Sequence, residues 1–252
     1  QGCNRTIKRL KEMKNLWNKS NAAACNSVLD LRVYSSRLLG AEPSLVLHGG
    51  GNTSVKAEFT NVFSESVPAL YVKGSGWDLR TIKAAGFPPV DLDYLRRLGA
   101  LADLSDTDMM RQLRLALLDP AGPTPSVEAI LHALIPCKYV DHTHADAVVT
   151  LSNTPNGTEL LQDLFGDEVL ILPYTMPGFV LARQVADATL NVDWECLKGI
   201  VLLHHGIFTF HEEAEQSYSN MINLVSMAEK RLATRSASLR PISHRGVLGQ
   251  EE

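Results

Sequence analysis

Two short segments of the chain place histidines where they could hold a metal ion. The first, KYVDHTHADAVV, contains His142 and His144 in a run that we interpret as a strand. Side chains two residues apart in a strand project to the same face, so both imidazoles point the same way. The second, VLLHHGIFTF, offers His204 and His205 at the end of another apolar strand. Because adjacent strand residues face opposite sides, only one of this pair can join the site, and spacing alone leaves open which.

A carboxylate lies just before the first histidine segment. Glu128 stands in PSVEAILHAL, in the first turn of a predicted helix whose face is otherwise apolar. It is well placed to approach an ion held by His142 and His144, although a first-turn glutamate also stabilises a helix through its macrodipole. A single histidine in an apolar run is more often a core residue, whereas this combination favours a metal site. His132, one turn later on a compatible face, could lie behind the site or simply pack, and of the two we expect packing.

Two glycine-rich turns offer main-chain amides to an anion. HGGGNTS sets three glycines before Asn52, and KGSGW places Ser75 between two glycines. Glycine lets N–H groups approach an anion closely. Each turn taken singly is more often a hairpin connection. Together with Ser126 at a predicted helix N-terminus, however, the two turns could converge on one phosphate.

The order of elements that must position these residues indicates an α/β domain. We predict helices over residues 6–20, 26–40, 91–104, 106–120, 126–136, 157–166, 177–191 and 211–235, with Ser27 or Asn26 as N-cap and Gly40 as C-cap of the second. We predict strands within 44–59, 69–79, 139–152, 168–174 and 199–210. Short connections favour antiparallel pairing, which predicts a mostly antiparallel sheet with helices on both faces. Residues 1–235 are expected to form one domain, and 236–252 a C-terminal tail or linker.

Composition narrows the class of partner. The 252 residues include 45% apolar and 21% charged residues, and 24 Lys+Arg against 28 Asp+Glu give a net charge of −4. Without a basic run, neither nucleic acid nor a membrane surface is expected as partner, which favours a small molecule. Four scattered cysteines indicate free thiols and a cytoplasmic protein. The sequence shows neither a long apolar run nor a signal peptide. Because it lacks an initiator Met, it is compatible with a fragment of a longer protein.

Four segments, taken in order, resemble the class II aldolase/adducin family. They are GGGNTSVK, VKGSGWDL, PSVEAILHALIPCKYVDHTHADAVV and LLHHGIFTF. The third is especially similar to the aldolase half of the bifunctional rhamnulose-1-phosphate aldolase/alcohol dehydrogenases, and the resemblance covers most of the chain. It implies a three-layer αβα sandwich with a largely antiparallel sheet, a catalytic zinc ion and a homotetramer with active sites between subunits.

The resemblance also assigns roles by position. Its zinc ligands fall on His142, His144 and His205, and its acid/base glutamate falls on Glu128. Its phosphate-binding positions fall on Asn52, Ser75, Gly76 and Ser126. The implied reaction cleaves a ketose 1-phosphate, a sugar phosphate, to dihydroxyacetone phosphate and an aldehyde. Zinc, or another divalent metal, stabilises an enediolate as a Lewis acid while the glutamate moves the proton at C3.

The chain departs from the family pattern in places, and rival functions share it. Val127 stands where the simple sugar-phosphate aldolases often have a second serine. The family's catalytic tyrosine is not assigned, with Tyr174 and Tyr218 as candidates by residue type only, and no GxGxxG motif of a dehydrogenase half is present. Sugar-phosphate 4-epimerases and a zinc-dependent dehydratase use the same scaffold. An adducin-head-like interaction module would lack the metal ligands, and a closed structural zinc site would need a fourth ligand.

Overall fold

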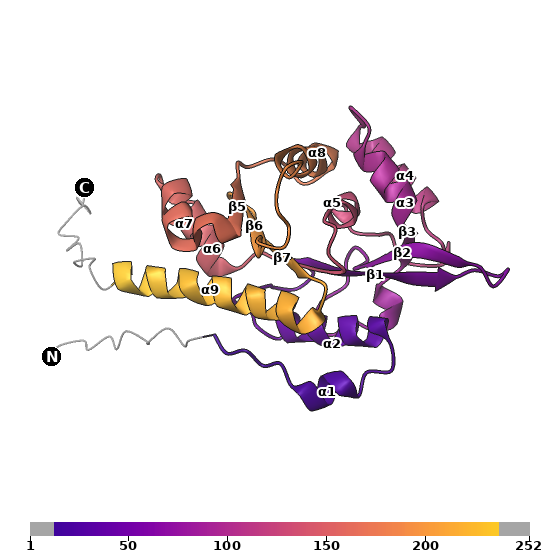
Figure 1. Cartoon of the computed structure of the whole chain (residues 1–252), viewed down its shortest axis with the longest axis horizontal. Coiled ribbons are helices and arrows are strands. Elements are labelled where there is room, and N and C mark those ends of the chain that lie inside the picture. Colours follow the sequence, from indigo (N-terminus) through magenta and orange to yellow (C-terminus); the bar gives the residue numbers. More distant parts are fainter. Residues whose placement is uncertain (1–12, 237–252) are drawn as a thin grey trace, which may run out of the picture.

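The computed structural model describes residues 13–236 as an α/β fold around one seven-stranded sheet (Figure 1). The strands are β1 (Asn52–Thr60), β2 (Ser66–Val72), β3 (Pro89–Asp91), β4 (Tyr139–Thr143), β5 (Val169–Leu172), β6 (Gly199–Leu202) and β7 (Gly206–His211). Their order across the sheet is β3-β2-β1-β4-β7-β6-β5. The histidine-bearing strand β4 therefore lies at the centre, between β1 and β7.

The sheet is mixed rather than mostly antiparallel as we predicted. Strands β5 and β6 pair in parallel, whereas the β1–β2, β1–β4, β2–β3, β4–β7 and β6–β7 pairs are antiparallel. A helix lies between β5 and β6 in the chain, and such a crossover returns the second strand in the direction of the first. The predicted α/β class is confirmed.

Helices cover both faces of this sheet. They are α1 (Lys19–Ala23), α2 (Val28–Gly40), α3 (Leu92–Gly99), α4 (Asp106–Leu115), α5 (Ala129–Leu134), α6 (Asp146–Ser152), α7 (Gly157–Phe165), α8 (Phe179–Ala188) and α9 (Ala214–Ser236), with 3-10 turns at Ala84–Gly86 and Gly166–Glu168. In Figure 1, α2 and α9 lie below the sheet, and α3, α4, α5 and α8 lie above it. Within residues 13–236, no helix is long and apolar enough to cross a bilayer.

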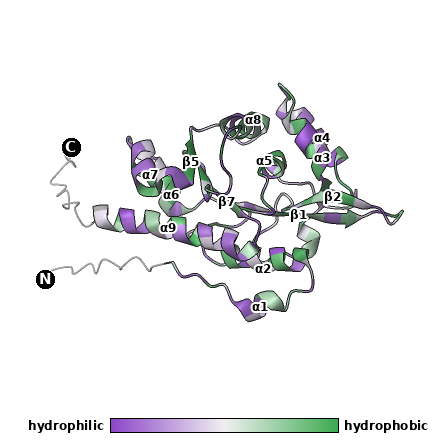
Figure 2. Cartoon of the chain, viewed as in Figure 1, coloured by the Kyte–Doolittle hydropathy of each residue, from purple (hydrophilic) through white to green (hydrophobic). Residues whose placement is uncertain are grey.

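The two larger of the three buried clusters in the described residues follow from the alternation of side chains along the strands. Phe208 and Phe210 belong to the core formed with α3, α4, α5 and α8, whereas Ile207 belongs to the core formed with α2, α6, α7 and α9. The long helix α9 contributes Met221 and Val225 to the second core. Figure 2 shows hydrophilic and hydrophobic residues alternating along it, as expected of a helix with one solvated face.

Several predicted boundaries are confirmed and others are wrong. Ser27 is the N-cap of α2, with its Oγ accepting from the Asp30 amide at 3.0 Å. The helix predicted over 6–20 begins only at Lys19 within the described residues, and its first part lies outside them. Asn18 explains this start, because its side chain caps α1 by accepting from the amide of residue 21.

Two predicted strands divide. The run 139–152 is a strand only as far as Thr143 and continues as α6, whose buried Ala147, Val148 and Leu151 have helical spacing. The run 199–210 is two antiparallel strands joined by a tight turn at residues 203–205. His204 and His205 consequently lie in a turn between two strands and not at the end of one.

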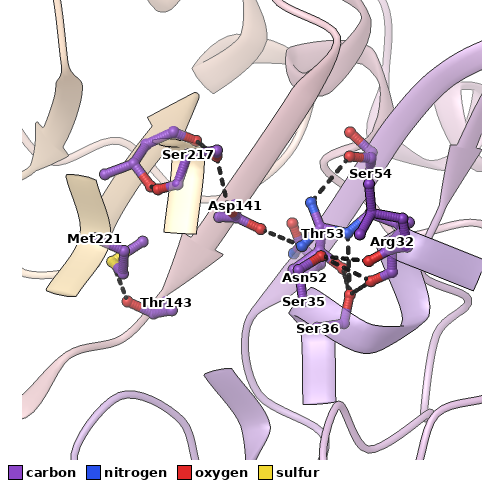
Figure 3. Close-up of polar contacts among 12 residues, drawn as sticks. Arg32, Ser35, Ser36, Asn52, Thr53, Ser54, Asp141, Thr143, Ser217 and Met221 are labelled. Atoms are coloured by element: carbon purple, nitrogen blue, oxygen red, sulfur yellow. Dashed lines mark hydrogen bonds and ion pairs between the residues drawn. The ribbon is translucent and has the colours of Figure 1, made fainter. Parts of the chain in front are cut away.

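A buried ion pair ties the central strand to the helices below it. Arg32 of α2 and Asp141 of β4 are both fully buried, and Nη2 lies 2.6 Å from Oδ1 (Figure 3). The second carboxylate oxygen of Asp141 accepts from Ser217 of α9 at 2.6 Å, and Arg32 Nη1 donates to the main-chain oxygen of Ser54. Because Asp141 and His142 are adjacent in β4, their side chains project to opposite faces of the sheet. The hydrogen bonds of Asp141 therefore hold β4 on the face opposite to the one that carries His142.

Candidate metal centre and substrate cavities

Three histidines converge at the end of β4 and the start of β7. His142 lies in β4, His144 follows that strand, and His205 directly precedes β7. One ring nitrogen of each lies within 4.8 Å of those of the other two. The ring centroid of His142 is 4.9 Å from that of His144 and from that of His205. The structure thus settles the choice that spacing left open, because His205 and not His204 faces the pair.

Ring nitrogens of this triad have lone pairs that could coordinate a cation. His142 Nδ1 donates to the main-chain oxygen of Ile207 at 3.1 Å, so the neutral ring directs the lone pair of Nε2 toward the triad. Among the described residues, neither this buried Nε2 nor Nδ1 of His205 has a hydrogen-bond partner. Unpartnered buried nitrogens are costly unless a ligand occupies them. A divalent cation therefore fits this site.

The protonation states agree with metal binding. Burial, reinforced by the neighbouring imidazoles, lowers the pKa of His142 well below its usual value. Burial and then the charge of Lys73 lower the pKa of His144. Burial and then the His144 ring lower the pKa of His205 to about 4. All three rings are accordingly neutral near pH 7, which is the form that binds a metal.

Glu128 faces the triad from the N-terminal end of α5. Its Oε2 lies 3.6 Å from His142 Nε2, and its Oε1 lies 3.7 Å from His205 Nε2. Burial raises the pKa of Glu128 to about 7, against the opposing effects of its hydrogen bond from Asn52 and of the Lys73 charge. A buried carboxyl with a pKa near neutrality can both accept and donate a proton.

A chain of hydrogen bonds stands behind this carboxylate. Asn52 Nδ2 donates to Glu128 Oε2 at 2.6 Å. Asn52 Oδ1 lies 2.5 Å from His132 Nε2, and Nδ1 of the same ring lies 2.7 Å from Ser54 Oγ. The expectation that His132 only packs in the core is therefore wrong, because both of its nitrogens are hydrogen-bonded. The sequence gives a weak signal for this role, namely a histidine four residues after Glu128 on the same helix.

The glycine-rich turns enclose a cavity beside the triad. It has a volume of about 270 Å³, and its lining includes all four predicted phosphate-binding residues, Asn52, Ser75, Gly76 and Ser126. His144, His205 and Glu128 line it as well. The first turn needs glycine, because Gly51 has φ +61° and a Cβ there would lie 2.7 Å from the main-chain oxygen of His142.

Sequence reasoning missed one charged residue of this cavity. Lys73 is buried at the end of β2, lines the cavity, and donates from Nζ to the main-chain oxygen of Gly49 at 2.8 Å. Burial lowers its pKa, which the carboxylates of Asp78 and Glu128 oppose. The available signal was a lysine directly before the KGSG turn. Val127, the departure from the family pattern, lines the same cavity.

A second cavity also borders His144 and His205. Its volume is about 550 Å³, and it shares His144, His205 and Pro177 with the first. Its remaining lining residues are Asp146, Val149, Thr150, Tyr174 and His204. His144 and His205 of the triad thus face both the cavity formed by the glycine turns and the larger one.

The sequence left the roles of His204, Tyr174 and Tyr218 open, and the structure shows which of them line a cavity. His204 has φ +60° and is held by Ser152 Oγ, which accepts from its main-chain amide at 3.1 Å, and by Asn153 Oδ1, 2.6 Å from Nδ1. Tyr174 lines the second cavity. Tyr218 belongs to α9, lines neither cavity, and is buried in the core that α9 forms with α2, α6 and α7.

Comparison with known proteins shows the family of this chain and solved structures with the same fold. The chain is 37% identical to the N-terminal class II aldolase domain of a conserved protein from Thermoplasma acidophilum, with a TM-score of 0.80 over 87% of this chain and 99% of that one. A sugar-phosphate aldolase from Thermotoga maritima shares the fold at 16% identity, with a TM-score of 0.60 over 83% of this chain and 95% of that one.

A longer relative comes from Bacillus subtilis. The uncharacterized oxidoreductase YuxG is 34% identical over 218 residues, which are 86% of this chain and 31% of that protein. This chain therefore spans about a third of the length of that relative. The family described as Class II Aldolase and Adducin N-terminal domain matches residues 31–232. The resemblance seen in the ordered motifs is confirmed, and the chain belongs to the class II aldolase/adducin family.

Proposed function

We propose that the chain is a zinc-dependent aldolase that cleaves a ketose 1-phosphate to dihydroxyacetone phosphate and an aldehyde. The observation that carries this proposal is the meeting of three neutral imidazoles and one buried carboxyl beside a cavity of glycine turns. Three neutral ligands leave the charge of a divalent ion undiminished, which suits a catalytic more than a closed structural site. His142, His144 and His205 would hold the ion.

The two cavities suit the two halves of such a substrate. Lys73 and the main-chain amides of the glycine turns supply positive potential for a phosphate in the smaller cavity. With the phosphate held there, the carbon chain extends past the triad into the larger cavity, where the aldehyde half lies. Fixing both ends of the substrate orients the scissile bond and lowers the entropic cost of reaction.

Glu128 is the proton carrier in this proposal. When the C3–C4 bond breaks, the C4 hydroxyl loses its proton to solvent and becomes the aldehyde carbonyl, and the electron pair of the broken bond stays on the phosphorylated fragment as an enediolate. The protonated Glu128 then donates to C3 and regains a proton from solvent. In the reverse direction the ionised carboxylate takes that proton. A pKa of about 7 allows both roles near neutral pH. A bound divalent cation supplies Lewis-acid stabilisation of negative charge on the substrate oxygens, which is worth several kcal/mol.

The test is a turnover screen of the zinc-loaded protein with ketose 1-phosphates and their unphosphorylated counterparts. We expect dihydroxyacetone phosphate to appear only with the phosphorylated sugars. An isomer of unchanged mass would instead indicate a 4-epimerase, and loss of one water would indicate a dehydratase. Purification without stoichiometric zinc and without turnover would favour an adducin-head-like interaction module.

The histidine triad is tested by His144→Ala. We expect this variant to lose stoichiometric zinc and to cleave at the background rate, because an ion left with two protein imidazoles is poorly held. His48→Asn is the matched control, since His48 is exposed, lines neither cavity, and has a φ of +50° that asparagine tolerates. Retained zinc and cleavage in His144→Ala would refute the assignment.

A further inference from the structure

One face of β1 is built to hold α5. Asn52, Ser54 and Lys56 alternate along the strand and so project toward the same side. Lys56 Nζ donates to the main-chain oxygens of His132 at 3.0 Å and Cys137 at 2.7 Å, at and just beyond the C-terminal end of α5. Burial lowers the pKa of Lys56 to about 7, and the protonated form of its amine complements the negative end of the helix dipole. The strand therefore fixes the helix that carries Glu128 at its N-terminus.

The hydrogen bonds between these elements have a definite direction. An ionised Glu128 can only accept, so Asn52 must turn its NH2 toward the carboxylate and its Oδ1 toward His132. His132 must then donate from Nε2, which leaves Nδ1 to accept from the Ser54 hydroxyl. Burial lowers the pKa of His132 well below its usual value, followed by the charges of Lys56 and Arg32, so the ring stays neutral and keeps one donor.

We propose that His132 is a positioning residue for the acid/base carboxyl. It acts through Asn52, whose amide it holds in the one orientation that donates to Glu128 Oε2. The other oxygen, Oε1, is then left facing His205 Nε2 at 3.7 Å without a hydrogen-bond partner among the described residues. Without the His132 donor, the Asn52 amide is free to turn its oxygen toward the carboxylate and displace it. The catalytic consequence rests on the proposed function.

The ring tautomer gives a test that needs no turnover. Two-bond proton–nitrogen correlation spectra of the wild-type protein, with and without zinc, should show His132 as the neutral Nε2–H tautomer. The assignment uses His132→Gln, in which this ring signal disappears. An Nδ1–H tautomer would overturn the proposal, because His132 could not then donate to Asn52. This measurement stays decisive even if the wild-type protein proves to have no aldolase activity.

Two variants separate positioning from packing. His132→Leu fills a similar space without a donor, whereas the terminal amide of His132→Gln can still donate to Asn52 Oδ1. We expect the leucine variant to lower kcat about ten- to a hundredfold with little change in KM, and the glutamine variant to recover most of the loss. Zinc content and the thermal unfolding midpoint of each variant establish that it is folded and loaded.

Equal losses of kcat in the two variants would overturn the proposal, because only one of them lacks the donor. A rise in KM alone would also overturn it, since that would assign the chain of hydrogen bonds to phosphate binding through Asn52. If His132→Leu does not fold, the wild-type tautomer and the activity of His132→Gln decide the question.

Discussion

At the scale of single residues, the chemistry depends on protonation states that burial sets. The triad imidazoles have lowered pKa values and are neutral before any ion arrives. Glu128 is the opposite case, because burial raises its pKa to about 7 and it holds a proton below that pH. A cation placed beside it favours the ionised form. Metal binding and loss of the Glu128 proton should therefore be coupled.

This coupling predicts a proton release that depends on pH. At about pH 6 the metal-free Glu128 is mostly protonated, so zinc binding should release about one more proton per ion in the wild-type chain than in Glu128→Gln. At about pH 8.5 the carboxyl is already ionised, and the difference should vanish. Calorimetry in buffers of different ionisation enthalpy measures the protons released. Equal release by both proteins at the lower pH would contradict the prediction.

The sequence was informative about the candidate metal ligands and less so about the residues that hydrogen-bond behind Glu128. Period-two spacing brings His142 and His144 together, and the order of motifs points to Glu128 and His205. The chain of hydrogen bonds through His132 is formed with residues 78 and 80 positions away, so local pattern carries almost no signal for it. Lys73 was missed for the same reason, because its burial beside the cavity follows from tertiary packing.

At the scale of elements, the site depends on how closely β7 approaches the end of β4. A Cβ built on Gly206 would lie 2.3 Å from the main-chain oxygen of Thr143 and 3.1 Å from His142 Cε1. Only glycine fits here without moving the strand end that carries two of the three histidines. Gly206 is thus needed for the close packing that brings His205 beside His142 and His144.

Gly206→Ala should consequently weaken metal binding without unfolding the protein. We expect a destabilisation of about 1–3 kcal/mol from overpacking and a loss of about ten- to a hundredfold in zinc affinity. Gly49→Ala is the control, because its Cβ would meet nothing nearer than the Gly76 oxygen at 4.0 Å. Chelator competition gives the affinity and urea unfolding gives the stability. Zinc affinity lowered equally in both variants would contradict this account of Gly206.

The sequence pattern predicts most helices and strands but not all of their boundaries. Most of the predicted helices and the central histidine strand appear in the structure, but the apolar run at 139–152 is strand and then helix. Short apolar runs fit either structure, and only packing against β1 and β7 decides the first half. The parallel pairing of β5 with β6 depends on the path of α8, which no local pattern specifies.

At the scale of the whole molecule, two cavities adjoin His144 and His205 of the triad. The smaller is built by turns following α2 and β2 and by the segment leading into α5, and the larger by α6 with the connections after β5 and β6. In the proposed reaction, the first holds the phosphate and the second holds the aldehyde half. Proton exchange at C3 of dihydroxyacetone phosphate needs only the first cavity, Glu128 and the metal, whereas cleavage needs both.

Substitutions in the two cavities should therefore have different effects. Thr150→Trp fills the larger cavity, so we expect cleavage to fall at least about tenfold while exchange of the C3 proton with deuterated water stays near the wild-type rate. Ser75→Asp puts a carboxylate in the smaller cavity and should suppress both reactions, because it repels the phosphate. Proton NMR follows exchange and a coupled assay follows cleavage, with zinc content checked for each variant. If Thr150→Trp also loses proton exchange, the two halves of the substrate are not divided between the cavities. If the wild-type protein catalyses neither exchange nor cleavage, the proposed function itself is contradicted.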